Sequence, residues 1–216
     1  MRGRPSHATP DDLVRAVRAA GIVDARVVDA VRRTPRIEFV PTECAALAYR
    51  DEPIPIGHGQ VTTQPSLSAR MLESLELGGD EHVLEVGTGL GYQTALLARL
   101  AADVVSIERW PELAAQARRS LAGQGIRNVT SLVGDGSRGV PESAPYDAVI
   151  VSAAHPEVPV PLAEQLRPGG RLVQPIGPGG SEDVEVFHRS ATGLDRGRVL
   201  TTARFVRLHG QYGYPP

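Results

Sequence analysis

Short apolar runs alternate with segments of helical periodicity over the second half of the chain. The runs are typical of buried strands and have the sequences HVLEVG (82–87), DVVSIE (103–108), NVTSLVGD (128–135), YDAVIVSAA (146–154) and RLVQPIG (171–177). The periodic segments predict helices in YQTALLARLA (92–101), PELAAQARRSLAGQG (111–125) and PVPLAEQLRPGG (159–170). Strands that alternate with helices indicate an α/β protein with a mostly parallel, doubly wound sheet covered on both faces.

The first half of the chain has a helical pattern instead. Amphipathic helices are predicted over residues 11–20, 24–33 and 65–77. Thr63 or Gln64 can serve as the N-cap of the third helix, since a proline follows at the first helical position, where its missing N–H has no cost.

The remaining segments define the organisation of the chain. Residues 35–64 carry no periodicity and are expected to be irregular, whereas DVEVFHR (183–189) and ARFVRL (203–208) are expected to be antiparallel strands. We predict one compact unit, in which residues 1–64 form N-terminal helices with a lip on the substrate side and residues 65–216 form the α/β core.

Composition narrows the possible function classes. The chain has 41% hydrophobic and 22% charged residues, which is ordinary for a globular protein. A formal net charge of -2 and an aromatic content of 4% give no basis for binding nucleic acid or an anionic membrane. Cys44 is the single cysteine and no apolar leader is present, so a cytoplasmic protein is expected. A monomer is a separate expectation, because the sequence does not give the oligomeric state. The histidines show no metal-ligand spacing, and no metal site is predicted.

The turn after the first strand of the α/β region is rich in glycine. Gly87, Gly89 and Gly91 stand in VLEVGTGLGYQTA, where glycine lets the backbone approach a ligand closely. A dinucleotide-binding fingerprint would have its third glycine one position later, and Tyr92 occupies that position. The spacing therefore favours a nucleoside without a pyrophosphate.

Acidic residues follow at the ends of the next two predicted strands. Glu108 stands 21 residues after Gly87, where a carboxylate can accept both ribose hydroxyls, and Asp135 is placed to meet an adenine edge. One acid at a strand end is usually only solvated, but two at consecutive strand ends after a glycine turn make a more specific pattern. The combination resembles class I methyltransferases, which bind S-adenosyl-L-methionine on a Rossmann-like sheet.

Further segments, in a fixed order, make the resemblance more specific. They are FVP (39–41), IGHGQVTTQPSLSARMLE (56–73), HVLEVGTGLGYQTALLARL (82–100), VVSIER (104–109), NVTSLVGDG (128–136), YDAVIVSAAHPEVP (146–159) and GGRLVQPIG (169–177). From about residue 10 to 208 the chain resembles the protein-L-isoaspartate (D-aspartate) O-methyltransferase family. The resemblance implies methyl transfer from S-adenosyl-L-methionine to the abnormal carboxylate of L-isoaspartyl residues in proteins or peptides. S-adenosyl-L-homocysteine is the second product, and the ester collapses to a succinimide whose hydrolysis repairs part of the damage.

The same resemblance implies the site residues. The hydroxyl of Thr63, where the family usually has serine, would lie beside the reacting carboxylate. The implied cofactor-binding residues are Gln60, Val61, Thr62, Ser68, Glu85, Gly87, Thr88, Gly89, Leu90, Glu108, Arg109, Asp135 and Gly136. The substrate groove would include His155, where the family often has proline, and His209 in RFVRLHGQYGYPP, which replaces a usual FVPL ending. A carboxylate with a pKa of about 4 needs no general base at neutral pH.

Three alternatives stay open. The two departures in the groove leave room for an aspartate O-methyltransferase of a bacterial peptide natural-product pathway, which installs a succinimide or isoaspartate in a modified precursor peptide. A nicotinamide oxidoreductase also needs a glycine turn and an acid about 20 residues later, but its third glycine would stand elsewhere. A binding module that kept the fold and lost turnover is disfavoured by the hydroxyl at Thr63.

Overall fold

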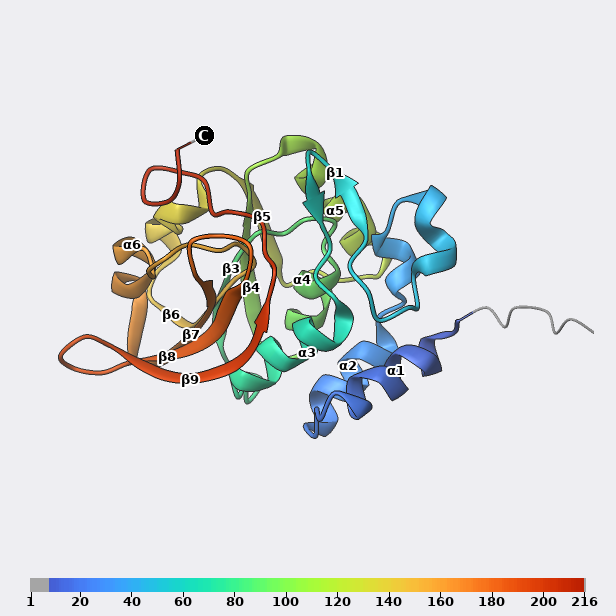
Figure 1. The fold of residues 1–216 in the computed structure, drawn as a ribbon, viewed down its shortest axis with the longest axis horizontal. Helices are drawn as coiled ribbons and strands as arrows, with labels where there is room; N and C mark the ends of the chain where they lie inside the picture. The colour runs from blue at the N-terminus through green and yellow to red at the C-terminus, as the bar shows by residue number, and fades with distance from the viewer. Residues whose placement is uncertain (1–7, 216) are drawn as a thin grey trace, which may run out of the picture.

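A seven-stranded sheet forms the centre of the computed structural model, which describes residues 8–215 (Figure 1). Residues 1–7 of the predicted N-terminal part and Pro216 of the predicted α/β core lie outside the described residues. The strand order is β5-β4-β3-β6-β7-β8-β9. The strands are β3 (His82–Val86), β4 (Asp103–Glu108), β5 (Val129–Val133), β6 (Tyr146–Val151), β7 (Leu166–Ile176), β8 (Glu182–Arg189) and β9 (Leu194–Ala203). The first five run parallel, and β8 is antiparallel to both of its neighbours, which confirms the predicted mostly parallel sheet.

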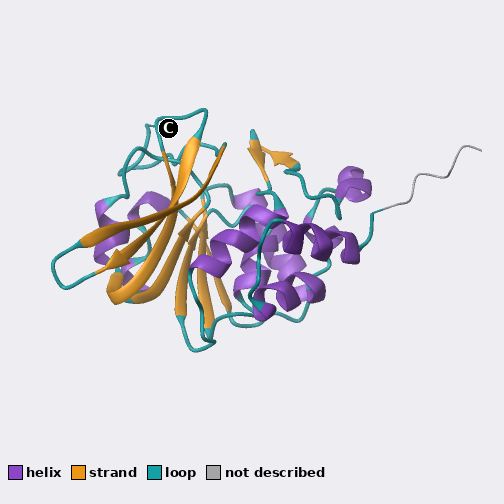
Figure 2. Ribbon diagram, turned by 60° about the horizontal axis from the view of Figure 1, so that its bottom comes forward, coloured by secondary structure: helices purple, strands orange, loops and turns teal. Residues whose placement is uncertain are grey.

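Helices cover the two faces of this sheet unequally (Figure 2). The α-helices are α1 (Pro10–Ala19), α2 (Ala25–Arg33), α3 (Pro65–Ser74), α4 (Tyr92–Leu97), α5 (Pro111–Gly123) and α6 (Val160–Glu164). Because side chains alternate along a strand, Val83 points to the face covered by α1 to α4, whereas Leu84 points to the face covered by α6. The sheet is therefore doubly wound.

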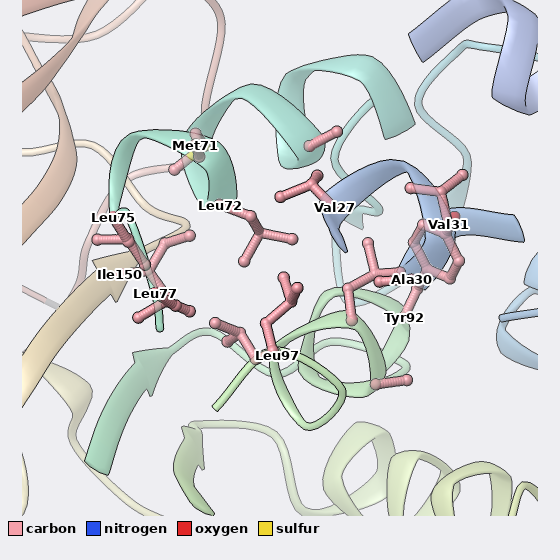
Figure 3. Close-up of a cluster of buried hydrophobic side chains, with 14 of the residues drawn as sticks. Val27, Ala30, Val31, Met71, Leu72, Leu75, Leu77, Tyr92, Leu97 and Ile150 are labelled. Carbon is pink, nitrogen blue, oxygen red and sulfur yellow. The ribbon is translucent and has the colours of Figure 1, made fainter. Parts of the chain in front are cut away.

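The N-terminal helices belong to the main core. Val27 from α2, Leu72 from α3 and Leu97 from α4 converge in one cluster that also contains Ile150 from β6 (Figure 3). Each of these four side chains is at most 2% exposed. The N-terminal helices therefore share the core of the sheet, and the predicted organisation, one compact unit divided at residue 64, remains a prediction.

Two helices differ from the prediction at their ends. Gln64 is the N-cap residue of α3, but neither its side chain nor that of Thr63 caps the helix. Instead, the carboxylate of Asp51 accepts the backbone N–H of Ser66 at 2.8 Å. The helix predicted over residues 159–170 is limited to α6, because the chain is already extended at Leu166, where it pairs with β6.

The strand predicted at residues 203–208 is wrong. The edge strand β9 lies earlier and pairs with β8 up to Ala203. Its sequence, LDRGRVLTTA, is mostly exposed at the edge and lacks the apolar alternation that identifies a strand. The alternation in ARFVRL has another cause, since Leu208 is buried beside β6 and donates its backbone N–H to the carbonyl of Ala154, whose own N–H donates to the carbonyl of Val206, outside the sheet.

The segment predicted to be irregular contains short elements. Two 3-10 helices, η1 (Arg36–Phe39) and η2 (Thr42–Leu47), precede a small antiparallel hairpin made of β1 (Pro55–Gly57) and β2 (Gln60–Val61). Figure 1 shows this hairpin above the sheet, beside the N-terminal half of the chain and facing the C-terminal segment. We call residues 60–63 the lip: it consists of β2 and the two residues that follow it.

Candidate active site

A cavity opens at the carboxyl ends of β3 and β4, between the lip and the C-terminal segment. Most of the residues predicted for the site line this cavity: Gln60, Val61, Thr62, Thr63, Ser68, Gly87, Thr88, Gly89, Leu90, Glu108, Arg109, Gly136 and His209. The side chains of Glu85, Asp135 and His155 lie outside it, for reasons that differ in each case. The cavity is thus built from four separate parts of the chain: lip, glycine loop, strand ends and C-terminal segment.

The glycine loop forms the floor of the cavity. Gly87 directly follows β3 with a φ of +96°, and a Cβ at this position would lie 3.3 Å from Cβ of Ser152. Gly89 has a φ of +55°, and a Cβ there would lie 3.2 Å from Cδ1 of Ile56 in the hairpin. Both positions favour glycine for its positive φ. The main chain at this loop therefore stays open to a ligand while the hairpin closes over it.

Glu108 joins the loop to the end of β4. Its Oε2 accepts the backbone N–H of Gly89 at 2.8 Å, and its Oε1 accepts the N–H of Trp110 at 3.0 Å. The residue is 5% exposed and lines the cavity. Since each carboxylate oxygen has a second lone pair, Glu108 can still accept two hydroxyl donors from a ligand.

Glu85 lies beneath the loop rather than in the cavity. Its carboxylate is fully buried and accepts hydrogen bonds from Thr94, from Ser106 at 2.7 Å and from Gln93 at 3.2 Å. Burial raises the pKa of Glu85 to about 7, although the three donors oppose this shift. In the structure Glu85 can act on a ligand only through the side chains and backbone above it.

Asp135 points toward the C-terminal segment. One of its oxygens accepts the backbone N–H of Ser137 at 2.9 Å and the Ser137 hydroxyl at 2.6 Å, and the other accepts the N–H of Gln211 at 2.7 Å. Burial alone would raise the pKa of Asp135, but these hydrogen bonds outweigh it and lower that pKa. An adenine contact by this carboxylate remains a prediction, whereas the contact with the C-terminal segment is present.

The polar side chains of the lip have different partners. The Thr62 hydroxyl accepts a guanidinium N–H of Arg36 at 2.8 Å and the N–H of Ile54 at 3.1 Å. The Gln60 amide donates to the carbonyl of His58 at 3.0 Å. We find no hydrogen bond from the Thr63 hydroxyl, which lines the cavity, to any residue between 8 and 215. Of the lip hydroxyls, the one at Thr63 is therefore free for a ligand.

The two histidines predicted for the substrate groove lie near the same aromatic ring, that of Tyr214. His209 lines the cavity, and its ring centroid lies 6.3 Å from that of Tyr214. His155 meets the same tyrosine edge-on at 5.3 Å, and its Nδ1 is 2.8 Å from the carbonyl oxygen of Glu157. The structure therefore places His209 in the cavity and His155 behind Tyr214.

Other residues line the cavity without having been predicted. They are Ile56, Val86, Tyr92, Gln93, Ile107, Leu113, Ser152, Ala153, Val206, Arg207 and Leu208. Ser152 and Ala153 directly follow β6, so the rule that ligands bind at carboxyl strand ends could have found them. Residues 206–208 were missed because their alternation was interpreted as a strand.

Within residues 8–215, no group of three or more histidine, cysteine, aspartate or glutamate side chains is arranged to hold a metal ion. None of the helices in the same part of the chain combines the length and apolar character needed to cross a bilayer.

A parallel sheet with a glycine loop after β3, an acid at the end of β4 and a cavity above both defines the fold of class I S-adenosylmethionine-dependent methyltransferases. Residues 8–213 match the family model described as protein-L-isoaspartate (D-aspartate) O-methyltransferase, and the chain belongs to this family.

Individual relatives support the assignment. The chain is 47% identical to a protein-L-isoaspartate O-methyltransferase of Methanoculleus marisnigri over 99% of this chain and 97% of that protein. It is 53% identical to the protein of the same name in Anaeromyxobacter dehalogenans over 87% of this chain and 91% of the relative. A solved protein-L-isoaspartate O-methyltransferase superposes with a TM-score of 0.83 at 29% identity, covering 95% of this chain and 67% of the other.

A second solved structure shows the fold alone. It is a Plasmodium falciparum protein described as a putative protein-L-isoaspartate O-methyltransferase, in complex with S-adenosyl-L-homocysteine. Its TM-score is 0.78 at 21% identity, and the match covers 95% of this chain and 99% of that one.

Proposed function

We propose that this protein transfers the methyl group of S-adenosyl-L-methionine to the carboxylate of L-isoaspartyl residues in proteins or peptides, as the first step of their repair. The observation that carries the proposal is the shared cavity, in which the loop and strand-end residues that would hold the cofactor face the unbonded hydroxyl of Thr63. The family membership supports the same reaction.

The residues of the cavity fit the cofactor. Glu108 offers carboxylate lone pairs to the ribose hydroxyls, and Ile107 and Leu113 supply an apolar wall for the base. Gln93 lines the cavity, and its Nε2 donates to Glu85 and Ser152. Its Oε1 is buried and has no hydrogen-bond partner within residues 8–215. An unpaired buried acceptor is costly, and the ammonium group of the cofactor would satisfy it. The remaining cofactor assignments of the sequence stay part of this proposal.

The chain has little proton chemistry to perform. When bound, the cofactor supplies an activated methyl group together with its leaving group. A substrate carboxylate is ionised at neutral pH, so the role of the protein is to align it and to exclude water. The Thr63 hydroxyl can donate one hydrogen bond that orients the carboxylate without neutralising it.

The setting of the reaction follows from the same proposal. The partner is a peptide or a damaged protein that carries an isoaspartyl residue, and we infer that a monomer acts on it in the cytoplasm. The formal net charge of -2 offers no support for a role on nucleic acid or a membrane surface.

The test is methyl transfer from labelled S-adenosyl-L-methionine onto an isoaspartyl peptide and onto its twin with normal aspartate. Transfer to the isoaspartyl peptide alone, followed by loss of methanol to a succinimide, is expected. Transfer to neither peptide by a protein that binds S-adenosyl-L-homocysteine would refute the proposal. Preferential transfer to aspartate in a cyclised precursor peptide would support the biosynthetic alternative instead.

A further inference from the structure

The C-terminal segment, residues 204–214, crosses the mouth of the cavity, and we call it the strap. Its first part is fixed to the sheet. The N–H of Phe205 donates to Oε2 of the buried Glu182 at 2.8 Å. The Val206 carbonyl accepts the N–H of Ala154 at 2.7 Å, and the Leu208 N–H donates to the Ala154 carbonyl at 2.8 Å. This part brings residues 206–209 to the cavity wall.

The second part of the strap is fixed by a different element. The turn after β5 holds Asp135 and Ser137, and Ser137 is fully buried. Asp135 accepts the N–H of Gln211 at 2.7 Å, and the Ser137 hydroxyl accepts the N–H of Tyr212 at 3.0 Å while donating to Asp135 at 2.6 Å. The backbone N–H groups of Gln211 and Tyr212 are thus held by the Asp135 carboxylate and by the Ser137 hydroxyl, which itself donates to that carboxylate. Charged acceptors make such hydrogen bonds stronger than neutral ones.

Gly210 shows how closely the strap approaches this anchor. A Cβ at position 210 would lie 1.9 Å from Oδ1 of Asp135 and 2.5 Å from Oγ of Ser137. The φ of Gly210 is +153°, a conformation that other residues rarely adopt. Any side chain at this position would have to lift the strap from Asp135.

The strap matters for the peptide because two of its polar side chains line the cavity. His209 lines the cavity there, and Arg207 lines it with its guanidinium 4.8 Å from the centroid of the Tyr214 ring. Tyr214 in turn donates its hydroxyl to the carbonyl of Pro178 at 2.9 Å. Without the second anchor, residues 210–213 of the strap would lose both hydrogen bonds to the turn after β5, and the strap would be held only at its ends, by the bonds to Glu182 and Ala154 and by the Tyr214–Pro178 bond.

We propose that Asp135 is a positioning residue for the peptide substrate, because it clips the strap over the cavity through Gln211 and, by way of Ser137, through Tyr212. The proposal rests on the proposed function of the cavity. It assigns Asp135 to the peptide side of the reaction, in addition to any contact with the nucleoside. The strap of this chain therefore selects and orients the substrate only while the clip is closed.

Gly210→Ala tests the clip without removing any candidate cofactor ligand. Gly193→Ala is the matched control, since no atom lies within 4 Å of a Cβ at that turn between β8 and β9. Gly210→Ala should raise the KM for an isoaspartyl peptide at least about tenfold, the equivalent of one charge-assisted hydrogen bond. Affinity for S-adenosyl-L-homocysteine should stay within about twofold, because every side chain that lines the cavity is unchanged in this variant. Ser137→Ala, which keeps Asp135 but removes the relay, should raise the peptide KM to a smaller extent.

Amide hydrogen exchange supplies a readout that does not depend on activity. The amides of Gln211 and Tyr212 should lose protection in Gly210→Ala and keep it in Gly193→Ala, with similar melting temperatures in both. An unchanged peptide KM in both Gly210→Ala and Ser137→Ala would overturn the proposal. A loss of affinity for S-adenosyl-L-homocysteine as large as the rise in peptide KM would also overturn it. If the wild type methylates no isoaspartyl peptide, the proposed function fails, and the exchange of these two amides alone decides whether the clip exists.

Discussion

The glycine loop and the lip face each other across one cavity, but they owe their shapes to different forces. The loop is held locally: Gly87 donates to the carbonyl of Ile107 at 2.9 Å, and Gly89 donates to the adjacent strand end at Glu108. The lip belongs to the small two-stranded hairpin, outside the seven-stranded sheet, and its Thr62 hydroxyl is held by Arg36, a residue from a different element. One side of a binding cavity can thus be held in place by hydrogen bonds of its own backbone, as in the glycine loop, or by one side chain distant in the sequence, as in the lip.

Arg36 is an unusual anchor. Its guanidinium is fully buried and donates to the carbonyls of Ala48 at 3.3 Å, Arg50 at 2.9 Å and Glu52 at 3.0 Å, besides Thr62. None of these acceptors carries a charge, and burial lowers the pKa of Arg36. The lip should therefore be far more sensitive to a single substitution than the loop is.

Replacing Arg36 is expected to have the largest effect. Arg36→Ala leaves several buried carbonyls without donors, which should cost about 3 kcal/mol or more of unfolding free energy. Arg33→Ala is the control, because its side chain is 67% exposed. Urea unfolding of both variants measures the difference. A loss below about 1 kcal/mol for Arg36→Ala would show that the lip does not depend on this anchor.

The pH dependence of stability tests the role of Glu85, which lies beneath the glycine loop. Its pKa is raised from 4.5 to about 7 in the folded protein, so the folded state binds the extra proton and stability falls as pH rises through this window. The full cost above pH 7 is roughly 3 kcal/mol. Glu85→Gln removes this cost and should flatten the decline between pH 4.5 and 7. Melting temperatures measured across pH would contradict the account if both proteins declined equally.

Thr63 tests whether the lip acts in the reaction or only in binding. Thr63→Ala should lower kcat about tenfold to a hundredfold, as expected for loss of one orienting hydrogen bond in the transition state. Affinity for S-adenosyl-L-homocysteine should change by less than about twofold. Thr63→Ser is the matched control and should retain most of the turnover. If Thr63→Ala weakened cofactor binding and left kcat unchanged, its assigned role would be wrong.

The smallest effect is expected for His58, where the hairpin contacts Trp110 close to the end of β4. The ring of His58, at the tip of the hairpin, stacks on that of Trp110 with centroids 4.2 Å apart. His58→Ala removes this stack, which is worth about 1 kcal/mol. Calorimetric titration should therefore show affinity for S-adenosyl-L-homocysteine weakened only about fivefold. A loss as large as that of a cavity residue would mean that the hairpin tip does more than close the lip.

The same contrast explains what could be predicted from the sequence. The sheet, the glycine loop and Glu108 follow from patterns a few residues long, because the apolar strands, the glycines and the acid at a strand end are each visible in a short stretch of sequence. The bond between Arg36 and Thr62 joins positions 26 residues apart and leaves no periodic signal. Likewise, residues 203–208 were mistaken for a strand, since Phe205 packs against the main core while Val206 and Leu208 line the cavity, and none of these three belongs to the seven-stranded sheet.

The central claim is that the loop and the lip hold one cofactor between them. The most direct test is a crystal structure of the protein with S-adenosyl-L-homocysteine and an isoaspartyl peptide. The account predicts the ribose at Glu108, the sulfur facing Thr63, and the peptide beneath the strap. A nucleoside bound elsewhere, or one whose sulfur points away from Thr63, would contradict it.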